Sequence, residues 1–413
     1  MKKVAALGLV AAMAITGLGA FAGCDNGSVD KDTITVGFIA LHDDQSTYDK
    51  NFLDAIREAC ANKGIPSDQL KIVTGIGEDN SCYEAAADLV DQGCDVIFAD
   101  SFGHENFIIQ AAREFTDVQF CHATGTQAHT VNLSNFHNAF ASIYEGRYLA
   151  GVAAGMKLVE MMNAGELTEK NYDDDGNIKI GYVGAYTYAE VISGYTSFFL
   201  GAKSIVEEQT DVSISMEVQF TGTWYDEVKE RNAANTLIDN GAALISQHAD
   251  SMGAPSACKK AGVPNVSYNG STASSCPNTF IVSSRIDWVP YFEYMIDCVT
   301  QKKAIDTDWT GTIQTGSVAL TALGTAAAEG TQEKMDEVKA KLISGEIKVF
   351  DCSTFTVNNG ETLTSYMADV DTDAAFTPDT EVISNGVFCE SAFRSAPYFN
   401  VQIDGITLLN SEF

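Results

Sequence analysis

Apolar strands that alternate with amphipathic helices, in two successive series along the chain, are the feature that most constrains the fold. Ile34–Ala40 and Asp95–Ala99 are short and almost wholly apolar, and each is followed by apolar residues at helical spacing. Near-continuous apolar strands between such helices are typical of a parallel sheet covered on both faces. The sequence therefore predicts an α/β fold.

The two series predict two doubly wound, Rossmann-like lobes joined by a hinge. In the first series we expect strands at 34–40, 71–76, 95–99, 119–123 and 131–136, with helices at 48–61, 83–92 and 106–115. The second starts with a helix at 144–164 and continues with strands at 178–185, 213–220 and 243–248 and helices at 189–208 and 226–240. Segments 280–286, 288–301 and 316–323 are expected to cross between lobes. We assign 34–138 and about 284–306 to the first lobe, and 139–283 and about 307–413 to the second.

The N-terminus has the pattern of an export signal. Lys2 and Lys3 precede an apolar run that ends in small residues before Cys24. Residues 1–23 are therefore predicted to be a signal peptide, and residues 24–33 a short polar tether. The small residues before Cys24 resemble the lipobox of bacterial lipoproteins, which implies that Cys24 is lipidated and holds the protein on the outer face of the cell membrane. A plain secretory signal with an incidental cysteine is the alternative.

Charge and motifs exclude several functions. The net charge of −31 repels phosphate backbones, so nucleic-acid binding is not expected. Phosphate-binding loops, nucleophile elbows and zinc-binding helices are absent from the sequence, and no C-x-x-C pair occurs among its ten cysteines. We expect no enzyme activity, no cofactor and no metal, and mostly buried free cysteines. Residues 173–177 are interpreted as a solvated turn and not as a calcium loop.

Polar and aromatic residues collect where the expected strands end. Ligands of doubly wound sheets bind beyond the carboxyl ends of the strands. Aromatic faces there can stack on a planar ring, and carboxylates can accept hydrogen bonds from it. For any one of these residues, helix capping is the equally plain alternative. The segments concerned are 41–49, 100–104, 186–188, 223–226 and 247–251.

Several strings then resemble the basic membrane protein (BMP) family of bacterial lipoproteins. The most specific are Tyr-Glu-Gly-Arg-Tyr-Leu-Ala-Gly at 144–151 and Gln-His-Ala-Asp-Ser at 247–251. Asp-Gln-Ser-Thr-Tyr at 44–48, Phe-Ala-Asp-Ser-Phe-Gly at 98–103 and Thr-Trp-Tyr-Asp at 223–226 support them. The resemblance covers nearly the whole chain after the leader. It implies a periplasmic-binding-protein type I-like fold and a substrate-binding lipoprotein of an ABC importer for purine nucleosides or bases, with permease subunits as partners.

The resemblance also implies site residues. Tyr48 and Phe198 would stack on either side of a purine, and other side chains would approach it from both lobes. Two departures from the family pattern weaken a ribose contact: Asn269 stands near an expected Asp, and the strand that leads to Asp287 lacks an expected Lys. A free base or another flat polar ring therefore remains open. The full expected set is Asp44, Ser46, Tyr48, Asp49, Ser101, Phe102, Tyr186, Phe198, Trp224, His248, Asp250, Asn269 and Asp287.

The leading hypothesis is thus a transport receptor that closes around its ligand. The alternative hypothesis, from a different functional class, is a sensor or surface protein of the same fold that signals to a membrane partner.

Overall fold

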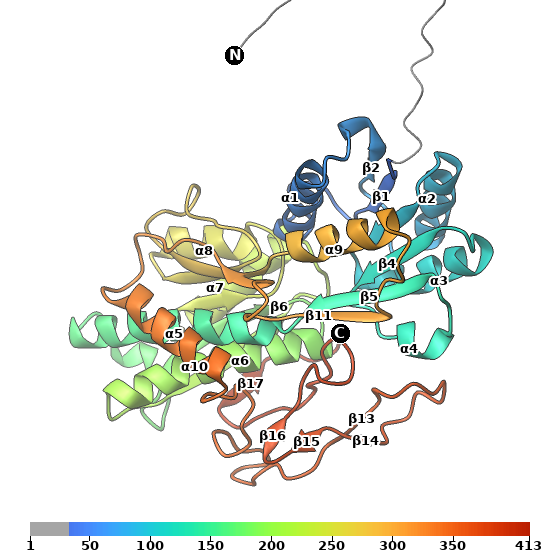
Figure 1. The fold of residues 1–413 in the computed structure, drawn as a ribbon. Coiled ribbons are helices and arrows are strands. Elements are labelled where there is room, and N and C mark those ends of the chain that lie inside the picture. Colours follow the sequence, from blue (N-terminus) through green and yellow to red (C-terminus); the bar gives the residue numbers. More distant parts are fainter. Residues whose placement is uncertain (1–32) are drawn as a thin grey trace, which may run out of the picture. The chain divides into compact units, whose positions relative to one another are not determined.

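A computed structural model describes residues 33–413 (Figure 1). The expected signal peptide, Cys24 and almost all of the tether lie outside this range. Residues 34–413 form one compact unit that contains two large sheets. Each sheet with its covering helices is called a lobe below.

The first sheet is parallel and has the strand order β11-β5-β4-β3-β1-β2. Its apolar strands are buried on both faces. On one face Phe38 and Phe98 contact Phe292 of α9, and α1 packs on α9; on the other face α2 and α3 cover Ile97. The elements are β1 Val36–Ile39, α1 Thr47–Asn62, β2 Leu70–Val73, α2 Asn80–Asp91, β3 Val96–Ala99, α3 Glu105–Glu114, β4 Gln119–Ala123, α4 Ala128–Val131, β5 Phe136–Ala141, α9 Val289–Thr300 and β11 Asp308–Gly311.

The second sheet has the order β12-β10-β9-β8-β6-β7-β17, and only the β10–β12 pair is antiparallel. Helices α5 and α6 run side by side, while α7 and α8 pack together on a separate apolar cluster (Figure 1). The elements are α5 Ile143–Asn163, β6 Ile178–Gly184, α6 Ala189–Gln209, β7 Ile214–Phe220, α7 Glu227–Asp239, β8 Ile245–Gln247, α8 Gly253–Ala261, β9 Asn265–Tyr268, β10 Phe280–Ile286, β12 Val318–Leu320, α10 Thr331–Ser344 and β17 Ile406–Leu408.

The chain crosses between the sheets three times: between β5 and α5, between β10 and α9, and between β11 and β12. Backbone hydrogen bonds tie these crossings together, from Ser142 N to Gly311 O at 2.8 Å and from Asp287 N to Ser317 O at 2.7 Å. The sheets change at about 142, 287 and 312–317, a few residues later than the boundaries expected from the sequence. Strand β11 pairs in the first sheet, although the sequence interpretation placed residues beyond about 307 in the second lobe.

Residues after α10 form a C-terminal segment rich in turns. Its short strands are β13 Met367–Ala368, β14 Thr380–Glu381, β15 Ile383–Ser384 and β16 Val387–Phe388. Phe350, Phe388 and Phe399 stack together in its core, and β17 then joins the second sheet beside β7. The segment therefore packs on the second lobe, as expected from the sequence.

One expected strand is wrong. Residues 131–136 end α4 and form a turn in which Asn132 has a φ of 52°, and the strand β5 begins only at Phe136. The sequence did not predict β5 correctly because the strand contains polar residues. These residues have partners within the protein: buried His137 is hydrogen-bonded to Gln119 and to Asp306 O, and Asn138 Nδ2 donates to Glu105. The nine cysteines after Cys24 are all free, and eight of them are buried, as expected.

Candidate functional site

A pocket opens where the carboxyl ends of both sheets meet. About 360 Å³ of it is not filled by atoms, and this figure includes open solvent. The closed lobes leave only a thin space between the lining side chains. Each lining segment follows a strand end, as the fold class requires. The lining residues are Leu41, His42, Tyr48, Asp49, Ser101, Phe102, Thr124, Glu190, Trp224, His248 and Asp250.

The two lobes touch directly beside this pocket. Thr47, in the first turn of α1, donates through both its backbone N and its Oγ1 to the carbonyl oxygen of Asp250, each at 3.1 Å. Asn51 Nδ2 donates to Ile286 O at 2.8 Å, and the ring centroids of Phe102 and Tyr188 lie 5.1 Å apart. The structure is therefore a closed form of a two-lobed protein.

On the first lobe, the start of α1 shapes the pocket. Ser46 caps the helix and donates from Oγ to Asp49 Oδ2 at 2.5 Å, while His42 N donates to Asp49 Oδ1 at 2.7 Å. Burial alone would raise the pKa of Asp49, but the hydrogen bonds from His42 and Ser46 outweigh it and lower that pKa. Tyr48 donates from its hydroxyl to Asp100 O at 2.7 Å, which fixes its ring in the wall.

On the second lobe, a buried arginine supports the wall. Arg147 of α5 donates to Gln247 O at 3.0 Å and to His248 Nδ1 at 2.9 Å, and its guanidinium lies 3.3 Å from the centroid of the Tyr268 ring. Because Nδ1 accepts, the proton of neutral His248 is on Nε2, which lies 3.4 Å from Glu190 Oε1. Burial, and then the Arg147 charge, lowers the pKa of His248, in keeping with this tautomer.

The pocket wall is rich in carboxylates with unused acceptor capacity. Among the described residues, Asp250 receives one side-chain hydrogen bond, from Asn269 Nδ2 at 3.4 Å. Burial, followed by the charges of Asp49, Glu230 and Glu190, raises its pKa well above the usual value, although Arg147 opposes this. Such a wall favours a ligand that donates hydrogen bonds to it.

Seven expected site residues come together in this pocket: Tyr48, Asp49, Ser101, Phe102, Trp224, His248 and Asp250. Six others lie outside its lining. Of these, Ser46 and Asn269 support it through Asp49 and Asp250. Tyr186 lies edge-on behind Trp224, with ring centroids 4.9 Å apart.

The last three expected residues have structural partners instead. Asp44 is exposed and pairs with Arg57 at 3.2 Å. Asp287 lies at a lobe crossing, where it pairs with Arg285. Phe198 is 1% exposed in the core, with its ring centroid 6.1 Å from that of Tyr182 in β6, so the expected stacking partner of Tyr48 does not reach the pocket.

Four lining residues were not in the expected set: Leu41, His42, Thr124 and Glu190. Leu41 and His42 belong to the segment after β1 from which Asp44, Ser46, Tyr48 and Asp49 were expected. Thr124 directly follows β4 and has a φ of 64°, and Glu190 is in the first turn of α6. The rule that ligands bind beyond the carboxyl ends of strands, applied to every strand and to the start of the helix that follows, would have included all four residues.

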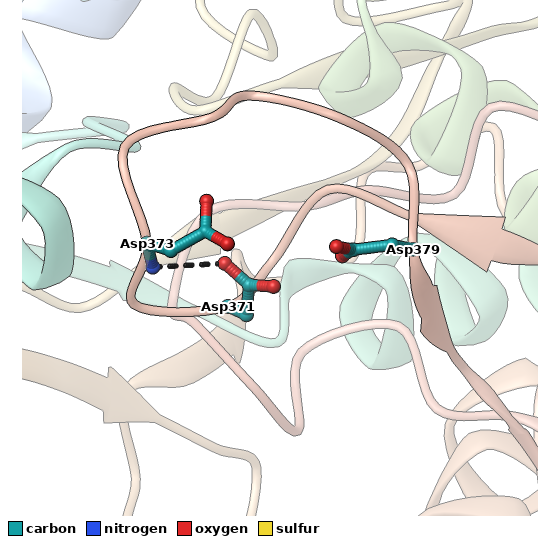
Figure 2. A group of neighbouring side chains, drawn as sticks. All are labelled: Asp371, Asp373 and Asp379. Carbon is teal, nitrogen blue, oxygen red and sulfur yellow. Dashed lines mark hydrogen bonds between the residues drawn. The ribbon is translucent and has the colours of Figure 1, made fainter.

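A separate group of three carboxylates lies outside the pocket lining (Figure 2). Asp371, Asp373 and Asp379 belong to the segment from β13 to β14, and their oxygens lie within 4.8 Å of one another. Asp373 N donates to Asp371 Oδ1 at 2.9 Å. A hydrogen bond to Asp371 raises the pKa of Asp379, with the charges of Asp371 and Asp373 adding to it. The group is largely exposed, and exposed acidic groups of this kind are common without an ion.

Glu230 of α7 gives a pH-dependent prediction about the loop after β8. It accepts from Ser251 N at 3.1 Å and from Asp226 N at 3.1 Å, and burial raises its pKa to about 7. The folded state therefore holds a proton that the unfolded chain releases near pH 4.5, so stability falls as pH rises from about 4.5 to 7. Between pH 5 and 8, the wild type should lose about 2 to 3 kcal/mol more than Glu230→Gln, measured by urea unfolding. If the free energy of unfolding of the wild type and of Glu230→Gln changed with pH in parallel, the raised pKa of Glu230 would be contradicted.

Comparison with known proteins agrees with this architecture. Among solved structures, a solute-binding protein of Aeropyrum pernix K1 superposes with a TM-score of 0.62 at 16% identity, covering 76% of this chain and 92% of the other. A solute-binding protein of an ABC transporter system from Conexibacter woesei gives 0.58 at 20% identity, covering 76% and 98%. The fold is that of periplasmic-binding-protein type I-like solute-binding proteins.

Residues 32–352 match the family model described as ABC transporter substrate-binding protein PnrA-like, and the chain belongs to this Bmp family. A purine-binding protein of Brucella abortus is 29% identical over 262 residues, which are 62% of this chain and 66% of that protein. A Haloferax volcanii protein, provisionally named as an ABC transporter glucose-binding protein, is 29% identical over 275 residues, 66% of this chain and 63% of its own length. The matched region thus spans just under two thirds of these relatives.

Proposed function

We propose that this protein is the extracytoplasmic ligand-binding component of an ABC importer and captures a purine base or purine nucleoside between its lobes. The observation that carries the proposal is the convergence of aromatic rings and underused carboxylates in one thin pocket. A purine offers ring faces to Tyr48 and Trp224 and N–H donors to Asp250 and Glu190. The purine-binding relative from Brucella abortus supports this choice.

The closed lobes then present a surface to permease subunits. Differential binding stabilises the closed form, because the ligand contacts both lobes at once only in that form. No helix among residues 33–413 is long and apolar enough to cross a membrane. Attachment through a lipidated Cys24 is part of the proposal because the small residues before this cysteine resemble a lipobox.

A thermal-shift screen tests the ligand class. We expect purine bases or nucleosides to raise the melting temperature, because ligand at one hundred times its Kd adds about 2.7 kcal/mol to the folded state. Glucose, a pyrimidine and an amino acid serve as comparison ligands. A rise in melting temperature with glucose and none with any purine would contradict the proposed purine ligand.

A further inference from the structure

A second hollow lies beside the pocket and shares Phe102, Thr124 and Glu190 with it. About 670 Å³ of it is not filled by atoms, open solvent included, and it is lined by three walls. Thr126 lines it from the first lobe, and Tyr188 from the second. The third wall is the part of the C-terminal segment around residues 394–400, which supplies Arg394, Ala396, Pro397 and Asn400.

This third wall lies beyond residue 352, where the family match ends. It is held to the second lobe on both sides. Ser193 Oγ donates to Glu390 Oε1 at 2.5 Å, and the hydroxyl of Tyr195 lies 3.0 Å from Gln402 Oε1. Between these anchors, Ser395 N donates to Asp308 Oδ2 of β11 in the first lobe at 2.9 Å. The wall is therefore a fixed part of the closed cleft.

The chemistry of the hollow favours a neutral, hydroxylated group. Asn400 offers an exposed amide, and Tyr188 offers an aromatic face. The hydroxyls of Thr126 and Thr187 donate to Glu105 Oε2 and Phe413 O, and their oxygens can still accept a hydrogen bond. The amide can both donate to and accept from hydroxyl groups.

An anionic group is disfavoured there. The guanidinium of Arg394 donates to the carbonyl oxygens of Ala396, Asp369 and Pro397, so three of its five N–H donors are engaged by the main chain. The Glu190 carboxylate, which lines the same hollow, would repel a negative charge.

We propose that this hollow is a second compartment of the ligand site, in which residues 394–400 contact an uncharged, hydroxyl-bearing substituent of the ring held in the pocket. The inference rests on the proposed function and adds to it a wall that the matched family region does not contain. Asn400 is the residue best placed to select the substituent, because its side chain is exposed and not committed to the core.

Calorimetry with adenine, adenosine and adenosine monophosphate tests the proposal on the full chain. Asn400→Trp fills the hollow from an exposed position. It should weaken adenosine binding about tenfold or more while changing adenine binding less than about twofold. Ser384→Trp, an exposed residue of the same segment that does not line the hollow, is the matched control and should change neither.

The outcomes separate the two proposals. If adenine and adenosine bind but Asn400→Trp affects both equally or neither, the second compartment is refuted and the proposed function stands. Tighter binding of the monophosphate than of adenosine would refute the neutral substituent. If no purine binds to the wild type, the proposed function fails and this inference fails with it.

Discussion

Asp250→Ala is expected to abolish the rise in melting temperature that a purine produces. The substitution removes the side-chain acceptor on the second lobe and leaves a ligand N–H without a partner. An unpaired buried donor costs up to about 3 kcal/mol, or about 100-fold in Kd. Trp224→Ala should have a similar effect, because it removes an aromatic face from the same wall.

The ligand-free protein separates this loss from misfolding. The backbone oxygen of Asp250, which accepts from Thr47, is unchanged by the substitution. The variant also removes a buried carboxyl whose pKa is raised by burial and by neighbouring acids, so it should unfold at no lower a temperature than the wild type. Asp54→Ala, at an exposed acid of α1 paired with Lys50, is the control and should bind normally. Ligand binding by Asp250→Ala within threefold of wild type would refute the assigned role.

Gly151→Ala should cost about 3 kcal/mol or more in the free energy of unfolding. A Cβ at this position would lie 2.1 Å from Phe198 O and 2.9 Å from Ala202 N, which are backbone atoms of α6. Backbone cannot rotate away as a side chain does, so the two helices would have to move apart and open the core between them. Gly201 makes the reciprocal contact, with its Cβ position 2.1 Å from Tyr148 O.

Urea unfolding measures this effect. Asn163→Ala, at an exposed position at the end of the same helix, is the control and should change stability by less than about 0.5 kcal/mol. A loss below about 1 kcal/mol for Gly151→Ala would mean that the helices separate more easily than their contact suggests.

The order of most helices and strands could be predicted from the sequence, because strands that are buried on both faces have an almost wholly apolar sequence. Much of the pocket could also be predicted, because ligands of such sheets bind at the ends of the strands. Phe198 shows the limit of this reasoning. Its helix is apolar on most sides, so periodicity cannot tell a side chain that faces the cleft from one that packs against the sheet, as Phe198 does on Tyr182. The polar strand β5 and the supporting role of Arg147 depend on partners distant in sequence, such as Glu105 and Gln247.

The hydrogen bond between Ser395 and Asp308 has a consequence for exchange kinetics. Like the bonds from Thr47 to Asp250 O, this link joins the two lobes, but it runs from a strand of the first lobe to a C-terminal segment that is anchored on the second. Opening of the cleft has to break this bond, and closure remakes it. Under the proposed function, it would shift the ligand-free population toward the closed form and slow release of the ligand.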